Sequence, residues 1–516
     1  MTDQEPQAES PSTGRSSGPA DAVPGRLRPP GFLDDLTVKL GHTLGGRIDD
    51  AVRNRHRRRL RRVGWQHALD ATAREFANGA APPREGNALE VLIDGSEALP
   101  RMARDMGAAT SYVHLTGWFL SPELALSREV EPLVVRTLLA ELAERIDVRV
   151  LLWKGAPVPA FRPSRGDVRE MEQTLTRHTK IKTALDACTG ASHCHHEKTI
   201  VIDGKVAFVG GIDLTVDGGD PYDTPNHRAR GGIGWHDIAA RIEGPAVRDV
   251  AEHFRLRWQS ASGEKLDPSS EPEPAGDVEL QIVRTLPAGA YRNVRKGDYS
   301  ILESYIGALR SAERIVYLES QFLWSPEIVD ILAGKLRQPP TDEFRVVVLL
   351  PARANDGADI SRGQVAALID ADDGDDRFLA CTVYAREGKL RDIVYVHSKI
   401  GIVDDRWLTV GSANLNAHSL LNDTEMNIVT HDETIARATR LRLWSEHLER
   451  EERDIEGNPA AIVDDLWRPI ATEQLHRIEE GKPLTHRLVR LPGVSRRRRR
   501  LVGPLQSHLY DIWRLG

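Results

Sequence analysis

Two short stretches of the chain carry the same three polar residues at the same spacing. They are His196-x-Lys198-x4-Asp203 and, about 200 residues later, His397-x-Lys399-x4-Asp404. A lone His-x-Lys pair is usually surface decoration. A full recurrence at matching places in the chain instead indicates a shared chemical task.

The spacing within each stretch places two of these residues together. On a β-strand, residues i and i+2 point to the same face, so each histidine would lie beside its lysine. That pairing is unfavourable unless something negative lies between the two side chains, and a phosphate is the obvious candidate. Lysine supplies fixed positive charge to phosphoryl oxygens, and histidine supplies a nucleophile or a proton. The two stretches therefore predict chemistry on a phosphate ester.

Further polar residues follow the two histidines at equal offsets. Asp213, in "GGIDLT", lies 17 residues after His196, and Asn414, in "GSANLN", lies 17 residues after His397. Ser412 in the second segment corresponds to Gly211 in the first. These small-residue turns could place a polar side chain against the same site. An anion at Asp213 would repel a phosphate unless it were itself paired.

Two later carboxylates are predicted to support the histidines. Asp237 lies in "GWHDIAARIEGP" and Glu425 lies in "NDTEMNIV". A carboxylate near each imidazole would fix its tautomer and stabilise its protonated form. Asp203 and Asp404, seven residues past their histidines, fall on the opposite face of the strand or in the next turn. For these two we predict structural ion pairs rather than chemistry.

A run of four residues at 193–196, His-Cys-His-His, raises the question of a metal. Neighbouring residues on a strand point to opposite faces, so the four side chains cannot all converge on one ion. We therefore predict neither a metal nor another cofactor.

The motifs belong to a series of short apolar runs that alternate with helical stretches, which is typical of an α/β layered domain. The predicted strands of the first series are 90–93, 112–116, 148–153, 198–202 and 207–209. Those of the second series are 279–284, 314–319, 345–350, 382–384, 399–403 and 407–410. Segments also match between the series: "SYVHLTGWFLSPEL" (111–124) with "RIVYLESQFLWSPEI" (314–328), and "VRVLLWKG" (148–155) with "FRVVVLLPA" (344–352). A duplicated fold is the economical explanation.

Composition shifts divide the chain further. We predict a disordered tail (1–30), a basic helical segment (31–86, with no proline before 82), a first half (87–261), a linker (262–277), a second half (278–450) and a C-terminal extension (451–516). Arginines cluster within 53–62 and again at 496–500. They form either a solvated surface or a contact with anionic lipid headgroups, where each basic residue contributes about 1 kcal/mol.

The overall composition bounds the class of protein. The 516 residues suit two fused halves, and a net charge of -7 argues against a dedicated nucleic-acid binder. Three cysteines without a CxxC pair favour a reduced, cytoplasmic protein. No run of about 18 apolar residues and no secretory signal is visible. If the substrate is a lipid, the protein must approach the bilayer from the side, as a peripheral protein at the inner membrane face.

Over about residues 87–450 the sequence resembles the phospholipase D superfamily, whose signature is the duplicated HxKxxxxD pattern. "HHEKTIVIDGKVAFVGGIDLT", "WHDIAARIEGPAVRDV", "YVHSKIGIVDDRWLTVGSANLN" and "YLESQF" are similar to segments of the phosphatidylcholine-cleaving branch. The resemblance implies two α/β halves related by a pseudo-twofold axis, each with a mixed sheet flanked by helices, and one site between them. Two complete motifs in one chain mean that a monomer suffices to build that site.

The resemblance also implies roles for individual residues. His196 would attack phosphorus and form a phosphohistidine, and His397 would protonate the leaving alcohol and then activate water or an alcohol. Lys198, Lys399 and Asn414 would hold the non-bridging oxygens, while Asp237 and Glu425 would support the imidazoles. No metal would be required, because the lysines already supply positive charge.

Three functions compete. The first is a phospholipase D that hydrolyses a glycerophospholipid such as phosphatidylcholine to phosphatidate, with possible transfer to alcohols. The second is a cardiolipin-synthase-like phosphatidyltransferase, although bacterial members of that group usually begin with membrane-spanning helices. The third is a nuclease of the same superfamily, and the low net basicity and the lack of a basic-aromatic tract count against it. We therefore expect a phospholipid substrate at a membrane surface and no nucleic acid.

Overall fold

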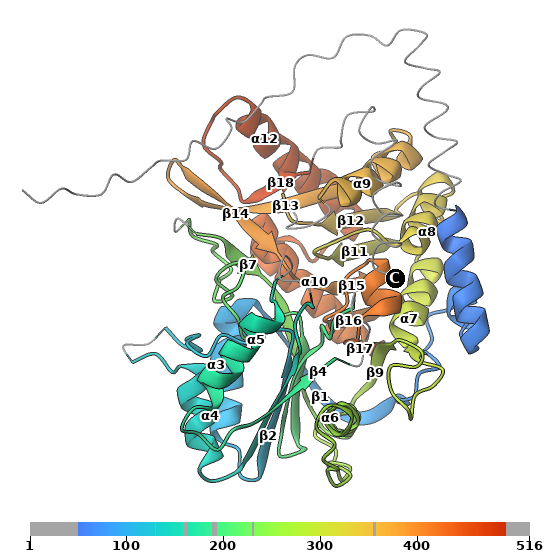
Figure 1. The fold of residues 1–516 in the computed structure, drawn as a ribbon. Helices are drawn as coiled ribbons and strands as arrows, with labels where there is room; N and C mark the ends of the chain where they lie inside the picture. Colours follow the sequence, from blue (N-terminus) through green and yellow to red (C-terminus); the bar gives the residue numbers. More distant parts are fainter. Residues whose placement is uncertain are drawn as a thin grey trace, which may run out of the picture.

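The computed structural model of the chain describes residues 50–128, 131–157, 162–187, 193–229, 232–353 and 358–491. The predicted tail at 1–30 and the basic run at 496–500 lie outside the described residues, as do residues 31–49 and Cys188. Two mixed β-sheets, each covered by helices, make up most of the described chain (Figure 1).

The first sheet is built from the earlier half of the chain. Its strands are β1 (Arg84–Ile93), β2 (Tyr112–Gly117), β3 (Asp147–Trp153), β4 (Lys182–Asp186), β5 (Lys198–Ile202), β6 (Val206–Gly210) and β8 (Ile238–Glu243). Their order across the sheet is β1-β8-β6-β5-β2-β3-β4. Only β2, β3 and β4 run parallel to one another, and the other pairs are antiparallel.

The second sheet repeats this arrangement. Its strands are β9 (Val278–Leu286), β11 (Ile315–Glu319), β12 (Arg345–Leu349), β13 (Phe378–Glu387), β15 (Ile400–Val403), β16 (Trp407–Gly411), β17 (Glu425–Thr430) and β18 (Leu488–Arg490). The order β9-β17-β16-β15-β11-β12-β13 matches the first sheet strand for strand, and β18 is added beyond β13. The predicted α/β fold with two related halves is confirmed.

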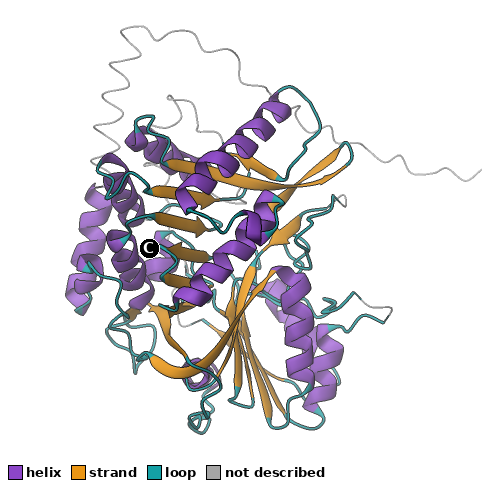
Figure 2. Cartoon of the chain, turned by 180° about the vertical axis from the view of Figure 1, so that it is seen from behind, coloured by secondary structure: helices purple, strands orange, loops and turns teal. Residues whose placement is uncertain are grey.

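The helices and sheets enclose separate apolar layers (Figure 2). The outer face of the first sheet packs on α3 (Asp94–Gly107), α4 (Val135–Ala143) and α5 (Arg165–Thr176), and that of the second sheet packs on α7 (Ser300–Ser311), α8 (Pro326–Arg337) and α9 (Ala358–Asp372). The inner faces share a central core with α6 (Val247–Ser262) and α10 (Glu433–Leu448). Side-chain alternation explains the layering: on β5, Val201 enters the central core while Ile200 and Ile202 face the outer helices.

Two strand pairs join the two halves through main-chain hydrogen bonds. β1 pairs with β9, and the short strand β7 (Gly234–His236) pairs in parallel with β14 (Leu390–Val396), which itself forms a hairpin with β13. A two-residue strand, β10 (Asp298–Tyr299), adds to β9. The β7–β14 pair brings the segment before the second HxK motif against the first half.

The N-terminal segment packs on the second half, although it precedes the first half in sequence. Residues 50–63 are helical and lie against α8, where His56 Nδ1 is 2.6 Å from Glu327 (Figure 1). The predicted helical segment of 31–86 is wrong beyond α2 (His67–Asp70), because residues 71–83 are irregular and residues 84–86 belong to β1. Side chains of the second half take the place of helical hydrogen bonds there: Gln281 accepts from the Ala77 N–H at 2.9 Å.

The C-terminal extension completes the second half. It comprises a 3₁₀ turn (Glu452–Asp454), α11 (Pro459–Ile462), a π turn (Val463–Trp467), α12 (Arg468–Glu479) and β18. Trp467 and Ala471 are fully buried in the central core. Within the described ranges, no helix combines the length and apolar character needed to cross a membrane.

Candidate active site

The two motif histidines meet where the halves face each other. Their ring centroids are 6.5 Å apart, and each ring lies just before its strand, β5 or β15. The His196 N–H donates to the Thr424 carbonyl of the second half at 3.0 Å, and the His397 N–H donates to the His236 carbonyl of the first half at 2.8 Å. Each half therefore fixes the backbone of the other half's histidine.

The carboxylates are exchanged in the same way. Asp237, from the first half, contacts His397 Nδ1 at 2.7 Å, and Glu425, from the second half, contacts His196 Nδ1 at 3.1 Å. The sequence placed a carboxylate beside each imidazole but did not indicate that the pairs cross. We call these two contacts the crossed pairs.

The main chain determines the tautomer of His196. Its Nδ1 is also 3.2 Å from the Ser412 carbonyl oxygen, which can only accept a hydrogen bond. Nδ1 must therefore carry the hydrogen, whatever the protonation state of Glu425. The lone pair is left on Nε2, where it is available to attack an electrophile.

Burial and the nearby lysines keep both imidazoles neutral. Burial, with the charges of Lys198 and Lys399, holds the pKa of His196 well below its usual value. The same causes, burial first and Lys399 next, lower the pKa of His397 to about 3. Burial raises the pKa of Asp237, but the His397 contact and the Lys399 charge outweigh it, and the net shift is downward. An anion between the lysines would favour the protonated form of His397.

Two further groups at the site have shifted pKa values. Burial lowers the pKa of the Lys399 ammonium to about 7, and burial raises the pKa of the Glu425 carboxyl to about 8 against the opposing charge of Lys198. Both groups would change charge near neutral pH. Anion binding at the site should therefore depend on pH.

We expect the affinity for tungstate, a tetrahedral oxyanion, to fall as the pH rises through about 7 to 8. Lys399 loses its positive charge over this range and Glu425 gains a negative one, so both changes disfavour an anion. Each proton involved can weaken binding by up to about tenfold per pH unit. Isothermal titration calorimetry measures the dependence, and Lys399→Arg, whose guanidinium stays charged, should remove the step near pH 7. A pH-independent affinity would contradict this assignment.

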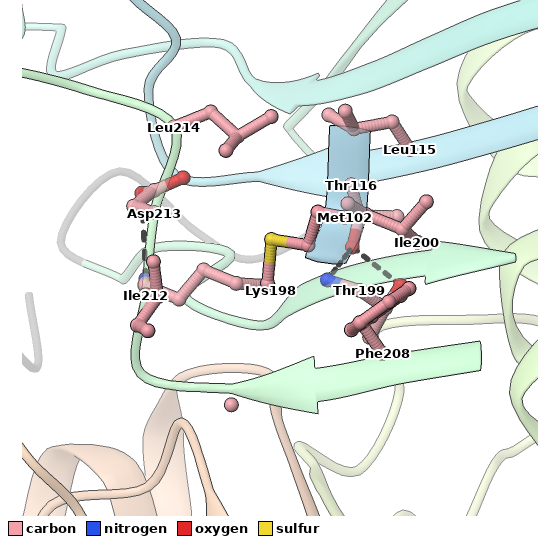
Figure 3. A pocket seen from close by; sticks show the side chains of 11 residues that line it. Met102, Leu115, Thr116, Lys198, Thr199, Ile200, Phe208, Ile212, Asp213 and Leu214 are labelled. Carbon is pink, nitrogen blue, oxygen red and sulfur yellow. Dashed lines mark hydrogen bonds and ion pairs between the residues drawn. The ribbon is translucent and has the colours of Figure 1, made fainter. Parts of the chain in front are cut away.

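The two lysines are fixed by the backbone of their own motifs. Lys198 Nζ donates to the His196 carbonyl at 2.6 Å, and Lys399 Nζ donates to the His397 carbonyl. Asp213 lies 3.6 Å from Lys198 Nζ, and the two line a cavity of about 10 Å³ (Figure 3). That space holds about one water molecule, so it is not a substrate cleft. Asp213 is thus paired, and its second role is to accept the Trp118 and Phe119 N–H groups at 3.2 and 3.3 Å.

Other side chains around the histidines were not found from the sequence. The main-chain N–H of Gln321, from "YLESQF", donates to Asn414 Oδ1 at 3.2 Å, and its side-chain amide donates to the Tyr395 hydroxyl at 2.6 Å. The Trp235 ring lies 4.5 Å from the His397 ring. Trp235 could have been selected because it lies two residues before Asp237 in "GWHD". Gln321 could have been selected because it lies in the segment 314–328, which matches 111–124 in the first half. Ser412, which the sequence did single out, donates to Glu425 at 2.5 Å.

The motif aspartates lie away from the histidines, in turns. Asp404 forms an ion pair with Arg74 at 2.9 Å and accepts backbone N–H groups of 313–315 at 2.7 to 2.9 Å. For Asp203 the expected ion pair is wrong within the described part of the chain. Its carboxylate instead accepts hydrogen bonds from the Thr110 hydroxyl and from the N–H groups of 110–112. Positive φ angles of 52° and 56° place both residues in tight turns where backbone donors converge.

The His-Cys-His-His run does not converge on one point. His195 is fully buried and contacts Asp186 at 3.0 Å and Thr424 at 2.7 Å, whereas His196 points to Glu425. His193 lies near His418 and Asp423 instead.

Position 211 has no room for a side chain larger than that of glycine, because Asp237 lies against it. A Cβ there would lie 2.1 Å from Asp237 Oδ1, so the carboxylate would have to move. We expect Gly211→Ala to lower kcat by about 10²-fold, because misplacing a catalytic contact by about 1 Å has that effect. Steady-state kinetics checks it. Gly107→Ala, where an added Cβ meets nothing within 4 Å, is the control and should leave kcat unchanged. Equal activity of the two variants would contradict the packing described here.

The two related halves each contribute one histidine and one carboxylate to a single site between them. Comparison with known proteins shows which proteins this chain is similar to. The family described as "Cardiolipin synthase, PLD-like domain" matches residues 305–444. The chain is 28% identical to Phospholipase D A of Dictyostelium discoideum, over 71% of this chain and 36% of that one. It is 26% identical to the major cardiolipin synthase ClsA of Bacillus subtilis, over 70% and 69% of the two chains.

These matches support membership of the phospholipase D superfamily. It spans 36% of the length of each of two phospholipases D, from Dictyostelium discoideum and Schizosaccharomyces pombe. Among solved structures, phosphatidylserine synthase of Haemophilus influenzae is similar with a TM-score of 0.48 and 12% sequence identity, covering 82% of this chain and 98% of that one.

Proposed function

We propose that this protein is a phospholipase D that transfers the phosphatidyl group of a glycerophospholipid to His196 and then to water or to an alcohol. The observation that carries the proposal is the separation of 6.5 Å between the two ring centroids. A phosphate between them would contact both rings, since each such contact spans about 3 Å.

The chemistry proceeds in two displacements. His196 Nε2 attacks phosphorus, the P–N bond forms, and the bond to the headgroup oxygen breaks as His397 Nε2 gives that oxygen a proton. In the second step His397 takes a proton from water or an alcohol, the oxygen attacks phosphorus, and the P–N bond breaks. Asp237, held at 2.7 Å from His397 Nδ1, stabilises the imidazolium form that His397 has before the first displacement and regains in the second.

The charges at the site support this sequence. His196 must be neutral to attack, and its pKa is already lowered by burial and the two lysines. His397 must be protonated to act as an acid, and the phosphodiester anion itself raises the pKa of His397 on arrival. Lys198, Lys399 and Asn414 are proposed to contact the non-bridging oxygens.

A lipid panel with and without ethanol tests the function. Wild-type protein should convert phosphatidylcholine to phosphatidate, and to phosphatidylethanol when ethanol is present, because either nucleophile can intercept a phosphohistidine. His196→Ala and His397→Ala are the controls and should form neither product. Nicking of plasmid DNA without lipid turnover would instead support a nuclease.

A second function is favoured by one observation: the matching family is described as cardiolipin synthase, and ClsA is covered over 69% of its length. In that case phosphatidylglycerol would be both donor and acceptor. Incubation with phosphatidylglycerol and analysis for cardiolipin separates the two activities.

The helix at 50–63 is proposed to contact anionic membranes. His56, Arg53 and Arg59 face the second half and contact Glu327, Asp330 and Asn422. The arginines at 55, 57, 58, 61 and 62 are exposed.

We expect the fourfold change of residues 55, 58, 61 and 62 from Arg to Gln to weaken binding to phosphatidylglycerol-containing vesicles by at least about tenfold, since each basic residue contributes about 1 kcal/mol. Vesicle co-sedimentation measures the effect. Binding to purely phosphatidylcholine vesicles is the control and should be equally weak for both proteins. Unchanged binding to anionic vesicles would dispose of the idea.

A further inference from the structure

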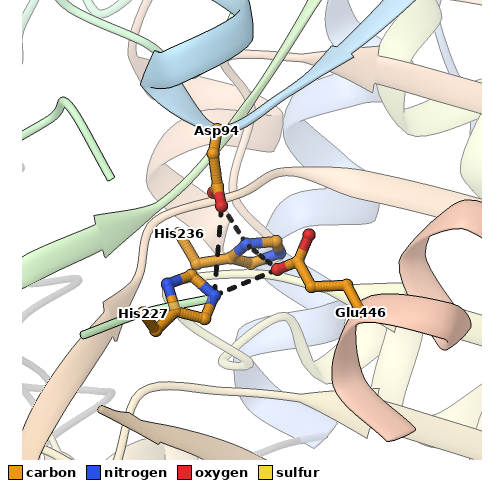
Figure 4. A group of neighbouring side chains, drawn as sticks. All are labelled: Asp94, His227, His236 and Glu446. Carbon is orange, nitrogen blue, oxygen red and sulfur yellow. Dashed lines mark hydrogen bonds and ion pairs between the residues drawn. The ribbon is translucent and has the colours of Figure 1, made fainter. Parts of the chain in front are cut away.

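A second cluster of histidines and carboxylates lies behind the crossed pairs, in the interior. It consists of Asp94 at the start of α3, His227 in the segment before β7, His236 at the end of β7, and Glu446 on α10 (Figure 4). The four side chains are 0 to 5% exposed, and one ligand atom from each lies within 4.8 Å of the others. The site chemistry proposed above uses none of them.

The spacing of these atoms suits a tetrahedral ion. His236 Nδ1 is 2.9 Å from Asp94 Oδ1 and 3.2 Å from Glu446 Oε1, and His227 Nε2 is 3.0 Å from Glu446 Oε1 and 3.9 Å from Asp94 Oδ2. Ligands at about 2.0 to 2.1 Å from a tetrahedral zinc are separated by about 3.3 Å. Asp94 Oδ2 is buried without a hydrogen-bond partner among the described residues and faces the His227 ring.

The outer contacts of the two imidazoles also match a metal site. A metal-bound histidine almost always gives its other ring N–H to a carboxylate or carbonyl. The remaining nitrogen of His227, Nδ1, lies 3.1 Å from Asp223, and that of His236, Nε2, lies 3.0 Å from Glu319. Glu319 is held in turn by Tyr317, Ser398 and His447. His236 therefore has a hydrogen-bonded second carboxylate that fixes its coordinating tautomer, whereas Asp223 lies near His227 Nδ1 without forming a hydrogen bond to it.

The charges of the cluster also accommodate a metal ion. Burial lowers the pKa of His227 and His236, but the charge of Asp94 and the other carboxylates outweighs it and the net shift is upward, so protonated imidazoles would balance the same charges in the absence of a metal. Asp94 and Glu446, with the outer Asp223 and Glu319, bring four carboxylates into the interior around three histidines. Buried charges are costly unless they are paired or bind a metal. A single dication would neutralise the two inner carboxylates.

From this geometry we infer that Asp94, His227, His236 and Glu446 bind one structural divalent metal ion, with zinc preferred by the two-imidazole, two-carboxylate ligand set. The ion would join three segments of the first half to α10 of the second half. It would also anchor the catalytic segment, because Asp94 accepts the Asp237 N–H at 3.2 Å and donates its own N–H to the Asp237 carbonyl at 2.8 Å.

The test uses the full chain, purified without an affinity tag from zinc-supplemented medium. We expect about one zinc per chain by inductively coupled plasma mass spectrometry. Treatment with dipicolinate should lower the unfolding midpoint by on the order of 5 to 10 °C, with recovery on adding zinc. Replacement by Co²⁺ should give the visible absorption bands of a tetrahedral site.

Variants locate the ion. His227→Gln should lose the metal, whereas His253→Gln should retain it; His253 is equally buried and has its own carboxylate partner, Glu197. If His227→Gln does not fold, the cobalt spectrum of the wild-type protein and its response to the chelator still show whether a metal is bound. Wild-type protein that carries no stoichiometric metal and does not respond to the chelator overturns the inference, whether or not the protein turns over lipid. Metal retained in a folded His227→Gln variant would overturn it as well.

Discussion

His196→Ala and His397→Ala should each reduce turnover of phosphatidylcholine by at least about 10³-fold, yet respond in opposite ways to a better leaving group. With phosphatidyl-p-nitrophenol, the departing phenolate needs no proton. His397→Ala should therefore regain the first step and release about one nitrophenol per site in a rapid burst. Turnover after the burst should stay slow, because His397 is also needed to activate water.

His196→Ala should show no burst, since it has lost the nucleophile. Stopped-flow absorbance follows the nitrophenolate, and intact-protein mass spectrometry should find the phosphatidyl adduct on His397→Ala alone. Phosphatidylcholine supplies the control, because neither variant should turn it over. A burst from His196→Ala, or none from His397→Ala, would reverse or remove the proposed roles.

Replacing the carboxylate of each crossed pair by its amide should lower kcat to different extents in the two pairs. Among the described residues, His397 Nδ1 has only Asp237 as a hydrogen-bond partner, whereas His196 Nδ1 also has the Ser412 carbonyl. Asp237→Asn should lower kcat by about 10³- to 10⁴-fold, because an amide can present a donor to Nδ1 and favour the wrong tautomer. Glu425→Gln should lower it by only about tenfold, because the Ser412 carbonyl keeps the His196 hydrogen in place.

The protonation state of Glu425 reinforces this difference. Burial raises its pKa to about 8, so near neutral pH the carboxyl is mostly uncharged and resembles an amide. Steady-state kinetics of the two variants, with thermal unfolding to show that both are folded, measures the ratio. Comparable losses in the two variants would show that the Ser412 carbonyl does not fix the tautomer.

The sequence was most informative where the duplication was visible. The motif strands β5 and β15 were predicted to within one residue, because a short run rich in β-branched apolar residues follows each lysine. The predicted strands did not include β4, β7, β8, β10, β14, β17 or β18. For β7 and β14 the reason is clear: "GWH" is too short to show alternation, and the two strands stabilise each other across the halves. The irregular path of 71–83 was missed because its hydrogen bonds come from side chains about 200 residues away.

The site residues were identified by type, but not by partner. Asp237 and Glu425 were selected as supports for the imidazoles, yet which carboxylate reaches which ring depends on how two separate sheets face each other. The cluster around His236 was not recognised in the sequence, because Asp94 and Glu446 lie far along the chain from His227 and His236. Local periodicity cannot encode a contact between Asp94 and Glu446, which only tertiary packing creates.

The exchange of supports between the halves has an evolutionary consequence. A half of this kind working as a symmetric homodimer would have to present identical groups on both sides of its substrate, since one gene would specify both. Covalent fusion releases that restriction, and Gly211 with Asp213 opposite Ser412 with Asn414 records the divergence that followed. One imidazole could then specialise in attack and the other in proton delivery, while mutual dependence prevents either copy from being lost.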